Sequence, residues 1–370
     1  MVRNSEFYSI LTDVAELTKI VNNVNAQFDN TAWRSFMQWD VPQIDLTFGV
    51  LSKDYDISPM AAVIDTNAPK PDLGGNGINM YYDSMPSIGG KVTFTKNDFR
   101  NIAALQNTAL GDSQMVDKLW SSVDRVIRGA HNRLNQMVFS GLTNGSIVIN
   151  ATNNPSGIPF SLDLRIPAGQ KLKAGFNQST KAAWSDGTNS DPVQDLIDMY
   201  QKSVTDKHPF GMYLMSLAKW NSFCAHPKVK SWVRNRMDSS NANRAIAPQE
   251  VQRELDMFYL PPIVILEQSY TQMVDGRQVA ITDGFDEDFV VGCPIGYLGT
   301  IKNAIPASIL AGVPSTPDAA FTYLEQNRFA LLSLWDAQTI KHTLELEAVA
   351  VPTINVPFDI YTLDTATAAS

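Results

Sequence analysis

The chain has 370 residues, a formal net charge of −9 and a charged fraction of only 18 %. An acidic chain argues against a broad nucleic-acid-binding surface, because phosphate contacts need clustered Lys and Arg. The two cysteines, Cys224 and Cys293, are too few and too far apart for a disulfide framework or a zinc site.

The sequence also gives no sign of a membrane. The first residues lack the basic start and apolar run of a signal peptide, and no apolar stretch reaches about 18 residues. We therefore expect no export signal, no membrane span and buried thiols in a reducing compartment.

Residues 5–28 predict an amphipathic helix, because apolar side chains recur there every three or four residues. Phe7, Leu11, Val14 and Leu17 belong to this apolar stripe. The stripe suits either a core-facing helix or an arm that packs on a neighbouring subunit, and the sequence leaves both interpretations open.

Residues 41–98 differ in character. Alternating apolar and polar residues at 44–48 and 91–95 predict strands, and a Pro- and Gly-rich segment with strand-like pieces at 60–64 and 78–82 separates them. A structureless loop of this length is uncommon in a compact domain, so we interpret it as a long hairpin. Two isolated strands are marginally stable in water, so the hairpin needs a partner surface.

A short helix is predicted at 98–110, followed by a long one at 113–141. The long helix keeps one apolar stripe from Val116 to Val138, with Asp112 or Ser113 as its cap and Gly141 as its stop. At 1.5 Å per residue it would extend roughly 40 Å, enough to brace a wide, thin body.

Residues 143–190 predict loops and irregular sheet, with a strand-like piece at 146–149. Asp191 and Pro192 then predict a helix start, and a short apolar run at 212–215 ends at Ser216, a cap for a further helix. This helix–strand–helix order is typical of an α/β unit.

The remaining residues favour strands. A helix near 248–257 leads to an apolar run at 262–266, and Asp275-Gly276 predicts the turn of a hairpin formed by 268–274 and 278–282. Further strand-like pieces follow at 289–292 and 297–300. Near the end, apolar residues occupy every second position from Leu344 to Ala350. No tandem repeat is visible, which argues against a solenoid or propeller. Because helices and strands are segregated along the chain, the predicted fold class is α+β.

Motifs for chemistry are absent or incomplete. A phosphate loop ending at Lys91 would need Gly and Ser or Thr where the chain has Met85 and Val92. Cys224 and His226 could supply two metal ligands or a nucleophilic pair, but no nearby residues complete either site. None of the histidines lies in a His-Glu-x-x-His frame, and His131 is interpreted as a surface or interface residue. We expect no cofactor and no metal.

Two charged clusters have ordinary interpretations. Asp283, Asp286, Glu287 and Asp288 do not match the spacing of a calcium loop and favour a solvated turn. A basic run flanks Trp232 and favours a solvated helix face or a subunit contact over a single-strand nucleic-acid site. The basic residues are Lys228, Lys230, Arg234 and Arg236.

The order of these elements resembles the Hong Kong 97-type capsid fold of tailed-bacteriophage major capsid proteins. Segments 83–92, 342–352 and 356–358 also resemble the strands with which that family closes its extended loop and its C-terminal sheet. The resemblance implies an N-terminal arm (1–40), an extended loop (41–98), a peripheral domain (99–190) with a spine helix (113–141), an axial domain (191–310) and peripheral return strands (311–370).

The resemblance further implies a subunit that self-assembles as hexamers and pentamers into an icosahedral shell, in the host bacterial cytoplasm, around double-stranded DNA that it does not bind sequence-specifically. Scaffold, portal and decoration proteins are the implied partners. The implied inter-subunit contacts are Phe7, Leu11, Val14 and Leu17 of the arm and Lys53, Lys70, Met85 and Ile88 of the loop. Rival interpretations are an encapsulin-like nanocompartment shell, an enzyme that uses Cys224, and a tail or other virion component.

Overall fold

The computed structural model of the chain divides into two compact units. Unit 1 comprises Met1–Phe48, Tyr82–Asn135 and Thr300–Thr353, and unit 2 comprises Gly49–Tyr81, Gln136–Gly299 and Ile354–Ser370. The structure describes residues 15, 18, 19, 22, 31–53, 78–105, 111–154, 157–236, 246–267, 270–274, 277–281, 284–312, 319–324, 328–336 and 338–370. No helix in these ranges is both long and apolar enough to cross a membrane.

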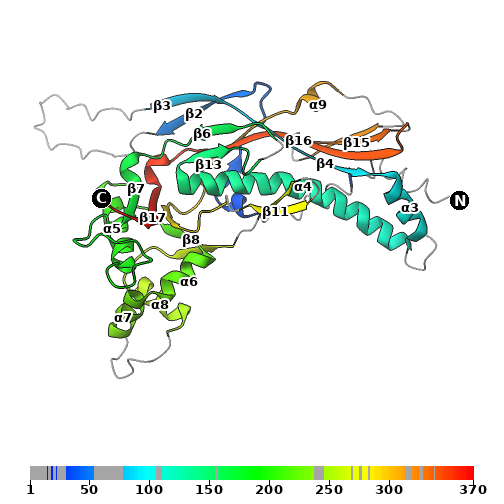
Figure 1. The fold of residues 1–370 in the computed structure, drawn as a ribbon. Coiled ribbons are helices and arrows are strands. Elements are labelled where there is room, and N and C mark those ends of the chain that lie inside the picture. The colour runs from blue at the N-terminus through cyan, green and yellow to red at the C-terminus, as the bar shows by residue number, and fades with distance from the viewer. Residues whose placement is uncertain are drawn as a thin grey trace, which may run out of the picture. The chain divides into compact units, whose positions relative to one another are not determined.

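Unit 1 is built on a six-stranded sheet (Figure 1). Its strands run in the order β1 (Met37–Trp39), β13 (Gly299–Ala304), β16 (Lys341–Ile354), β15 (Phe329–Asp336) and β14 (Ala319–Leu324), and β4 (Ser87–Phe94) also pairs with β16. β15 and β4 both pair antiparallel with the first half of β16, one on each edge. The alternating residues Leu344 to Ala350 are buried, which confirms the predicted strand.

An aromatic cluster fills the core of unit 1 beside the short helix η1 (Ala32–Ser35). Trp33 is fully buried, and its ring meets Trp39 edge-on at 5.3 Å and lies nearly parallel to His131 at 6.1 Å. The prediction that His131 is a surface or interface residue is wrong. It follows Ile127 by four residues and precedes Leu134 by three, so it shares their buried helix face.

The long helix α4 spans Gly111–Asn144 and confirms the long helix predicted at 113–141, with two more residues at its start and three at its end. Gly141 does not stop it. A Cβ at Gly141 would lie 2.6 Å from Leu164 Cδ1, so glycine there permits close packing instead. The helix ends before Gly145, which has a φ of 71° and donates its N–H to the Gly141 carbonyl.

The preceding helix α3 spans Lys96–Leu105. It confirms the helix predicted at 98–110 over most of its length, while residues 106–110 lie outside the described ranges.

Unit 2 contains a five-stranded mixed sheet in the order β7 (Lys171–Ala174), β17 (Tyr361–Ala368), β12 (Phe289–Cys293), β8 (Met212–Ser216) and β9 (Ile263–Leu266). The outer pairs β7–β17 and β8–β9 are parallel, and the inner pairs are antiparallel. Every residue of β8 is buried, as the apolar run at 212–215 predicted.

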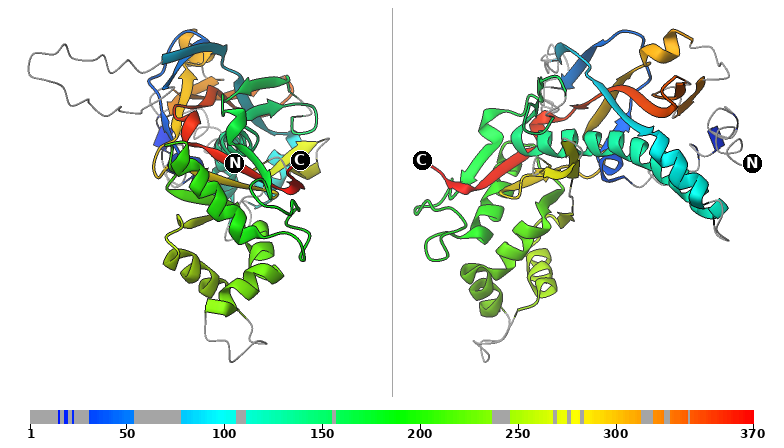
Figure 2. Two further views of the ribbon diagram at one scale, coloured as in Figure 1. Left: turned by 90° about the vertical axis from the view of Figure 1, so that its left-hand side faces the viewer. Right: turned by 45° about the vertical axis from the view of Figure 1, so that its right-hand side comes forward.

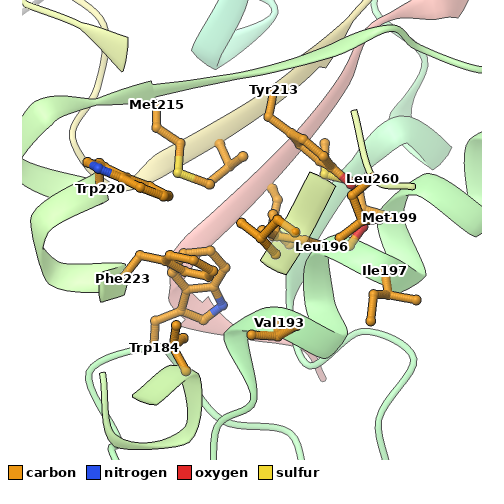
Figure 3. Close-up of a cluster of buried hydrophobic side chains, with 14 of the residues drawn as sticks. Trp184, Val193, Leu196, Ile197, Met199, Tyr213, Met215, Trp220, Phe223 and Leu260 are labelled. Carbon is orange, nitrogen blue, oxygen red and sulfur yellow. The ribbon is translucent and has the colours of Figure 1, made fainter. Parts of the chain in front are cut away.

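Helices α5 (Pro192–Thr205), α6 (Leu217–Ala225), α7 (Pro227–Arg236) and α8 (Pro248–Met257) share one hydrophobic core with this sheet (Figure 3). The Trp220 and Phe223 rings stack at 5.7 Å, and Trp184 lies 5.5 Å from Phe223. The buried Tyr213 donates its hydroxyl hydrogen to the Leu196 carbonyl at 2.6 Å. Its polar atom is therefore satisfied inside the core.

The helix starts predicted in unit 2 are confirmed by capping hydrogen bonds. The Asp191 side chain accepts the Gln194 N–H ahead of α5, and Ser216 accepts the Lys219 N–H ahead of α6. These caps satisfy donors that the first helical turn leaves free.

The described chain also has three two-stranded sheets: β2 (Thr47–Lys53) with β3 (Ile78–Ser84), β5 (Ser146–Ile149) with β6 (Phe160–Asp163), and β10 (Tyr270–Val274) with β11 (Arg277–Ile281). It further contains the short helices η2 (Ala168–Gln170), α9 (Ala307–Leu310) and η3 (Pro357–Asp359). The β10–β11 pair confirms the predicted hairpin. The strand predicted at 44–48 begins only at Thr47, because Gln43 and Asp45 hold a bend before it. The strand-like piece at 60–64 lies outside the described residues.

Candidate assembly surfaces

The segment that leads into β2, residues 40–46, presents an ordered apolar surface in unit 1, and we call it the loop root. Val41, Ile44 and Leu46 are 78 %, 72 % and 54 % exposed. Exposed apolar residues close together on one short segment mark interaction surfaces more often than scattered ones do. Sequence reasoning missed this surface because it assigned Ile44 and Leu46 to a strand.

Hydrogen bonds fix the loop root from both sides. Gln43 donates its N–H to the Asn303 carbonyl at 3.1 Å and accepts the Ile305 N–H at 2.8 Å. Its side-chain amide donates to the Asp45 and Thr47 carbonyls at 2.8 Å and 2.6 Å. The apolar side chains therefore project from a fixed backbone, which lowers the entropy that binding would cost.

An ion pair anchors the start of the loop root. Lys302 Nζ lies 2.5 Å from Asp40 Oδ2, and Arg328 donates to the Asp40 carbonyl at 3.0 Å. Partial burial opposes ionisation of Asp40, but the bond to Lys302 and the nearby cations together hold its pKa below 3.8. Asp40 is therefore ionised at neutral pH and ties the segment to β13.

Two of the predicted contact residues lie inside unit 1. Met85 is 6 % exposed and donates its N–H to the Leu46 carbonyl at 2.9 Å. Ile88 is 8 % exposed and lies opposite Ala348 in the β4–β16 pair. Both side chains pack within the subunit, and a contact with a neighbour stays a prediction for each.

The other predicted contacts cannot be placed. Phe7, Leu11, Val14, Leu17 and Lys70 lie outside the described residues, and Lys53 is described only as the last residue of β2. Within the predicted arm, Thr18 is helical, and its hydroxyl lies 2.8 Å from that of Thr322 in β14.

A second exposed apolar surface lies in unit 2, where α8 ends. Met257, Phe258 and Tyr259, which we call the α8 tip, are 65 %, 39 % and 91 % exposed. The Phe258 ring meets Trp232 of α7 edge-on at 6.1 Å. Sequence reasoning missed this surface as well, although three large apolar residues directly after the polar end of a helix would have signalled it.

The predicted basic run forms helix α7, which lies beside α8 (Figure 2). Val229 and Val233 are buried, whereas Lys228 is exposed and Lys230 half-buried. Neither lysine forms an ion pair with a described residue. The helix therefore keeps a cationic face on an acidic chain.

Cys224 and His226 do not form a nucleophilic pair. Burial raises the pKa of the Cys224 thiol to about 12, so the thiolate is not available at neutral pH. His226 Nδ1 accepts the Lys228 N–H at 3.2 Å, and Nε2 lies 3.0 Å from the Ser190 hydroxyl. Both ring nitrogens are thus engaged in hydrogen bonds that hold the start of α7, a structural role.

Other polar groups do not assemble a chemical centre in the part of the chain that is described. No three His, Cys, Asp or Glu residues there are placed to hold a metal ion. Asp286 accepts the Asp288 N–H and Asp288 pairs with Lys219 at 3.0 Å, as expected for a solvated turn. A cavity of about 160 Å³ in unit 2 is lined mainly by amide and hydroxyl side chains, with Asp286 as its one charged lining residue.

Comparison with known proteins gives a family. The model of the family described as phage major capsid protein E matches residues 13–317, well over half of the chain. A search of curated proteins finds no match.

The chain is also similar to solved structures. A crystal structure from E. coli CFT073, assigned as the capsid protein of a prophage, covers 96 % of this chain and 99 % of its own, with 12 % identity and a TM-score of 0.58. A phage-related protein from Bordetella bronchiseptica RB50 covers 94 % and 97 %, with 11 % identity and a TM-score of 0.47. The capsid of Myoviridae phage XM1 covers 90 % of each chain, with 13 % identity and a TM-score of 0.42.

The first of these similarities is close enough to give the fold, an α+β capsid fold of the Hong Kong 97 type. Its low identity leaves the function to the family match. Because that match spans most of the chain, the protein belongs to the phage major capsid protein E family and is a structural protein of the tailed-phage capsid.

Proposed function

We propose that this capsid protein self-assembles as hexamers and pentamers that close an icosahedral head shell around phage double-stranded DNA. The family match over residues 13–317 carries the proposal. Assembly takes place in the host bacterial cytoplasm, with scaffold, portal and decoration proteins as further partners.

Features of the subunit fit this function. β2 and β3 form a sheet of only two strands, and such a pair needs another surface for stability in water. The loop root and the α8 tip present apolar side chains on ordered backbone. Many weak contacts of this kind, repeated around a closed shell, add up to a stable particle.

The shell encloses DNA without reading its sequence. The chain carries 38 acidic against 29 basic residues, an excess that disfavours tight binding to phosphates. Loose contact would leave packaged DNA free to move during filling and ejection.

Electron microscopy of particles formed by the full chain tests the proposal. Closed shells or capsomers, and nuclease-protected double-stranded DNA in particles from infected cells, are the expected results. A chain that remains monomeric at all concentrations, with or without a co-expressed scaffold, would contradict it.

The same particles separate the rival interpretations. A shell that encloses a cargo protein and no DNA would identify a nanocompartment. An enzyme based on Cys224 is disfavoured by the protonated, buried thiol. Any turnover lost in Cys224→Ser with assembly intact would revive it.

A further inference from the structure

Helices α5 and α8 of unit 2 end in the same hydrogen-bonded motif. After α5, Lys207 donates its N–H to the Val204 carbonyl at 3.1 Å and His208 donates to Ser203 at 2.8 Å. After α8, Tyr259 donates to Asp256 at 3.0 Å and Leu260 to Leu255 at 3.4 Å. Both are Schellman motifs, which require one residue in the left-handed conformation.

Glycine normally occupies that position, and here neither residue is glycine. Lys207 has a φ of 65° and Tyr259 a φ of 59°. A bulky side chain in this region is strained, and such strain persists where the residue serves a function. Lys207 has an exposed, charged side chain that water solvates. The Tyr259 ring is 91 % exposed and gains nothing from burial within its own subunit.

We propose that the α8 tip contacts a second copy of this chain, with the Tyr259 ring packed against the basic helix α7 of that copy. This inference rests on the proposed self-assembly and names one of its contacts. The Phe258 ring contacts Trp232 of its own subunit, whereas Tyr259 is the most exposed residue of the tip.

Charge complementarity favours another copy as the occupant. Lys228 and Lys230 on α7 form no ion pair with a described residue, and neither does Asp256 at the edge of the tip. The chain thus carries a cationic helix and an aromatic tip beside an anionic residue, and neither set of charges has an ion-pair partner among the described residues. A second copy supplies both complements in a head-to-tail contact, the kind of contact that forms a ring where the rotation between copies closes. A lysine over the Tyr259 ring adds a cation–π attraction.

The two motifs provide a matched test. Tyr259→Gly and Lys207→Gly both place glycine in a left-handed position, so each should raise the unfolding midpoint of the free subunit by about 2 °C. Only Tyr259→Gly should raise the concentration needed for assembly, by about tenfold. Tyr259→Asn, which tolerates the left-handed conformation, serves as a second variant should the glycine variant fold poorly.

A charge exchange tests the partner surface. Lys228→Glu with Lys230→Glu should weaken assembly, Asp256→Lys should weaken it too, and the triple variant should recover most of the loss. Equal assembly by wild type and Tyr259→Gly, or no recovery in the triple variant, would overturn the contact while self-assembly of the wild type stands. A wild type that never assembles overturns the proposed function and this contact together.

Discussion

The imidazole ring of His131 lies nearly parallel to the Trp33 indole, with an interplanar angle of 15° and 6.1 Å between centroids. Phe329 approaches the same imidazole at 5.4 Å. A titratable group is thus enclosed by aromatic rings in the core of unit 1. Burial first, and the Arg34 charge second, lower the pKa of His131 to about 3.

Unit 1 should lose stability in acid. The unfolded histidine titrates at 6.5, so the unfolded chain takes up its proton first as the pH falls. The stabilisation is complete above pH 6.5 and is lost progressively towards pH 3. Between about pH 7 and about pH 5, the protonation of His131 alone should lower the free energy of unfolding by about 2 kcal/mol. Denaturant titrations at both pH values measure this decrease in the free energy of unfolding. In His131→Phe the decrease should be smaller than in the wild type by that amount, and an equal decrease would show that His131 is not responsible.

Asp195 in unit 2 should have the opposite effect on stability as the pH falls. Its buried carboxylate accepts from Gly175 N–H at 2.9 Å, Gln178 Nε2 at 2.8 Å and Trp184 Nε1 at 2.7 Å. Burial raises its pKa to about 6, despite these donors. The folded carboxyl therefore takes up its proton before the unfolded one, and stability rises as the pH falls through 6 towards 3.8.

Asp195→Asn separates charge from hydrogen bonding. The amide oxygen can still accept from Gly175 and Gln178, but its NH₂ group meets the Trp184 N–H. We expect a loss of about 2 kcal/mol near pH 7. In the wild type, protonation of Asp195 should raise the free energy of unfolding by about 1 kcal/mol between about pH 7 and about pH 5, and we expect this gain to disappear in the variant. Calorimetry at both pH values measures the two effects, and a gain retained in the variant would assign it to another group.

Local signals in the sequence predicted local structure well. Asp191 and Ser216 were assigned as caps because their side chains satisfy donors only three residues away. The alternation from Leu344 to Ala350 predicted a strand for a similar reason, since side-chain period is a local property.

Long-range pairing was beyond such reasoning. Thr93 of β4 faces Thr343 of β16, 250 residues away, and nothing local specifies that register. The same limit explains why a polar His131 was not predicted to lie in a core, and why Tyr259 was not recognised as exposed. Each depends on neighbours that only the folded chain brings together.

Two glycines of α4 should respond differently to alanine. A Cβ at Gly129 meets nothing within 4 Å, so Gly129→Ala should stabilise the subunit by about 1 kcal/mol through helix propensity. A Cβ at Gly141 would lie 2.6 Å from Leu164 Cδ1 and 3.2 Å from Ile147 Cγ1, both in a buried cluster. Gly141→Ala should therefore cost about 1–3 kcal/mol. Thermal unfolding of both variants tests this, and stabilisation by both would mean that Leu164 can move aside.

Variants of the loop root and of Met85 should distinguish a contact between copies from a contribution to the core of the subunit. In a variant with Val41→Ser, Ile44→Ser and Leu46→Ser, exposed apolar groups are lost, so the free subunit should keep its stability within about 0.5 kcal/mol per site. Its assembly should weaken markedly, because the same groups would be buried between copies. Light scattering against protein concentration measures assembly, and denaturant unfolding measures the subunit.

Met85→Ala is the matched control, since this buried side chain lies beside the same segment. It should destabilise the free subunit by about 2–5 kcal/mol, because it leaves a cavity. Weaker assembly of the variant with three serines in the loop root, together with normal unfolding of its free subunit, would identify the loop root as a contact surface. Normal assembly of that variant would exclude this role.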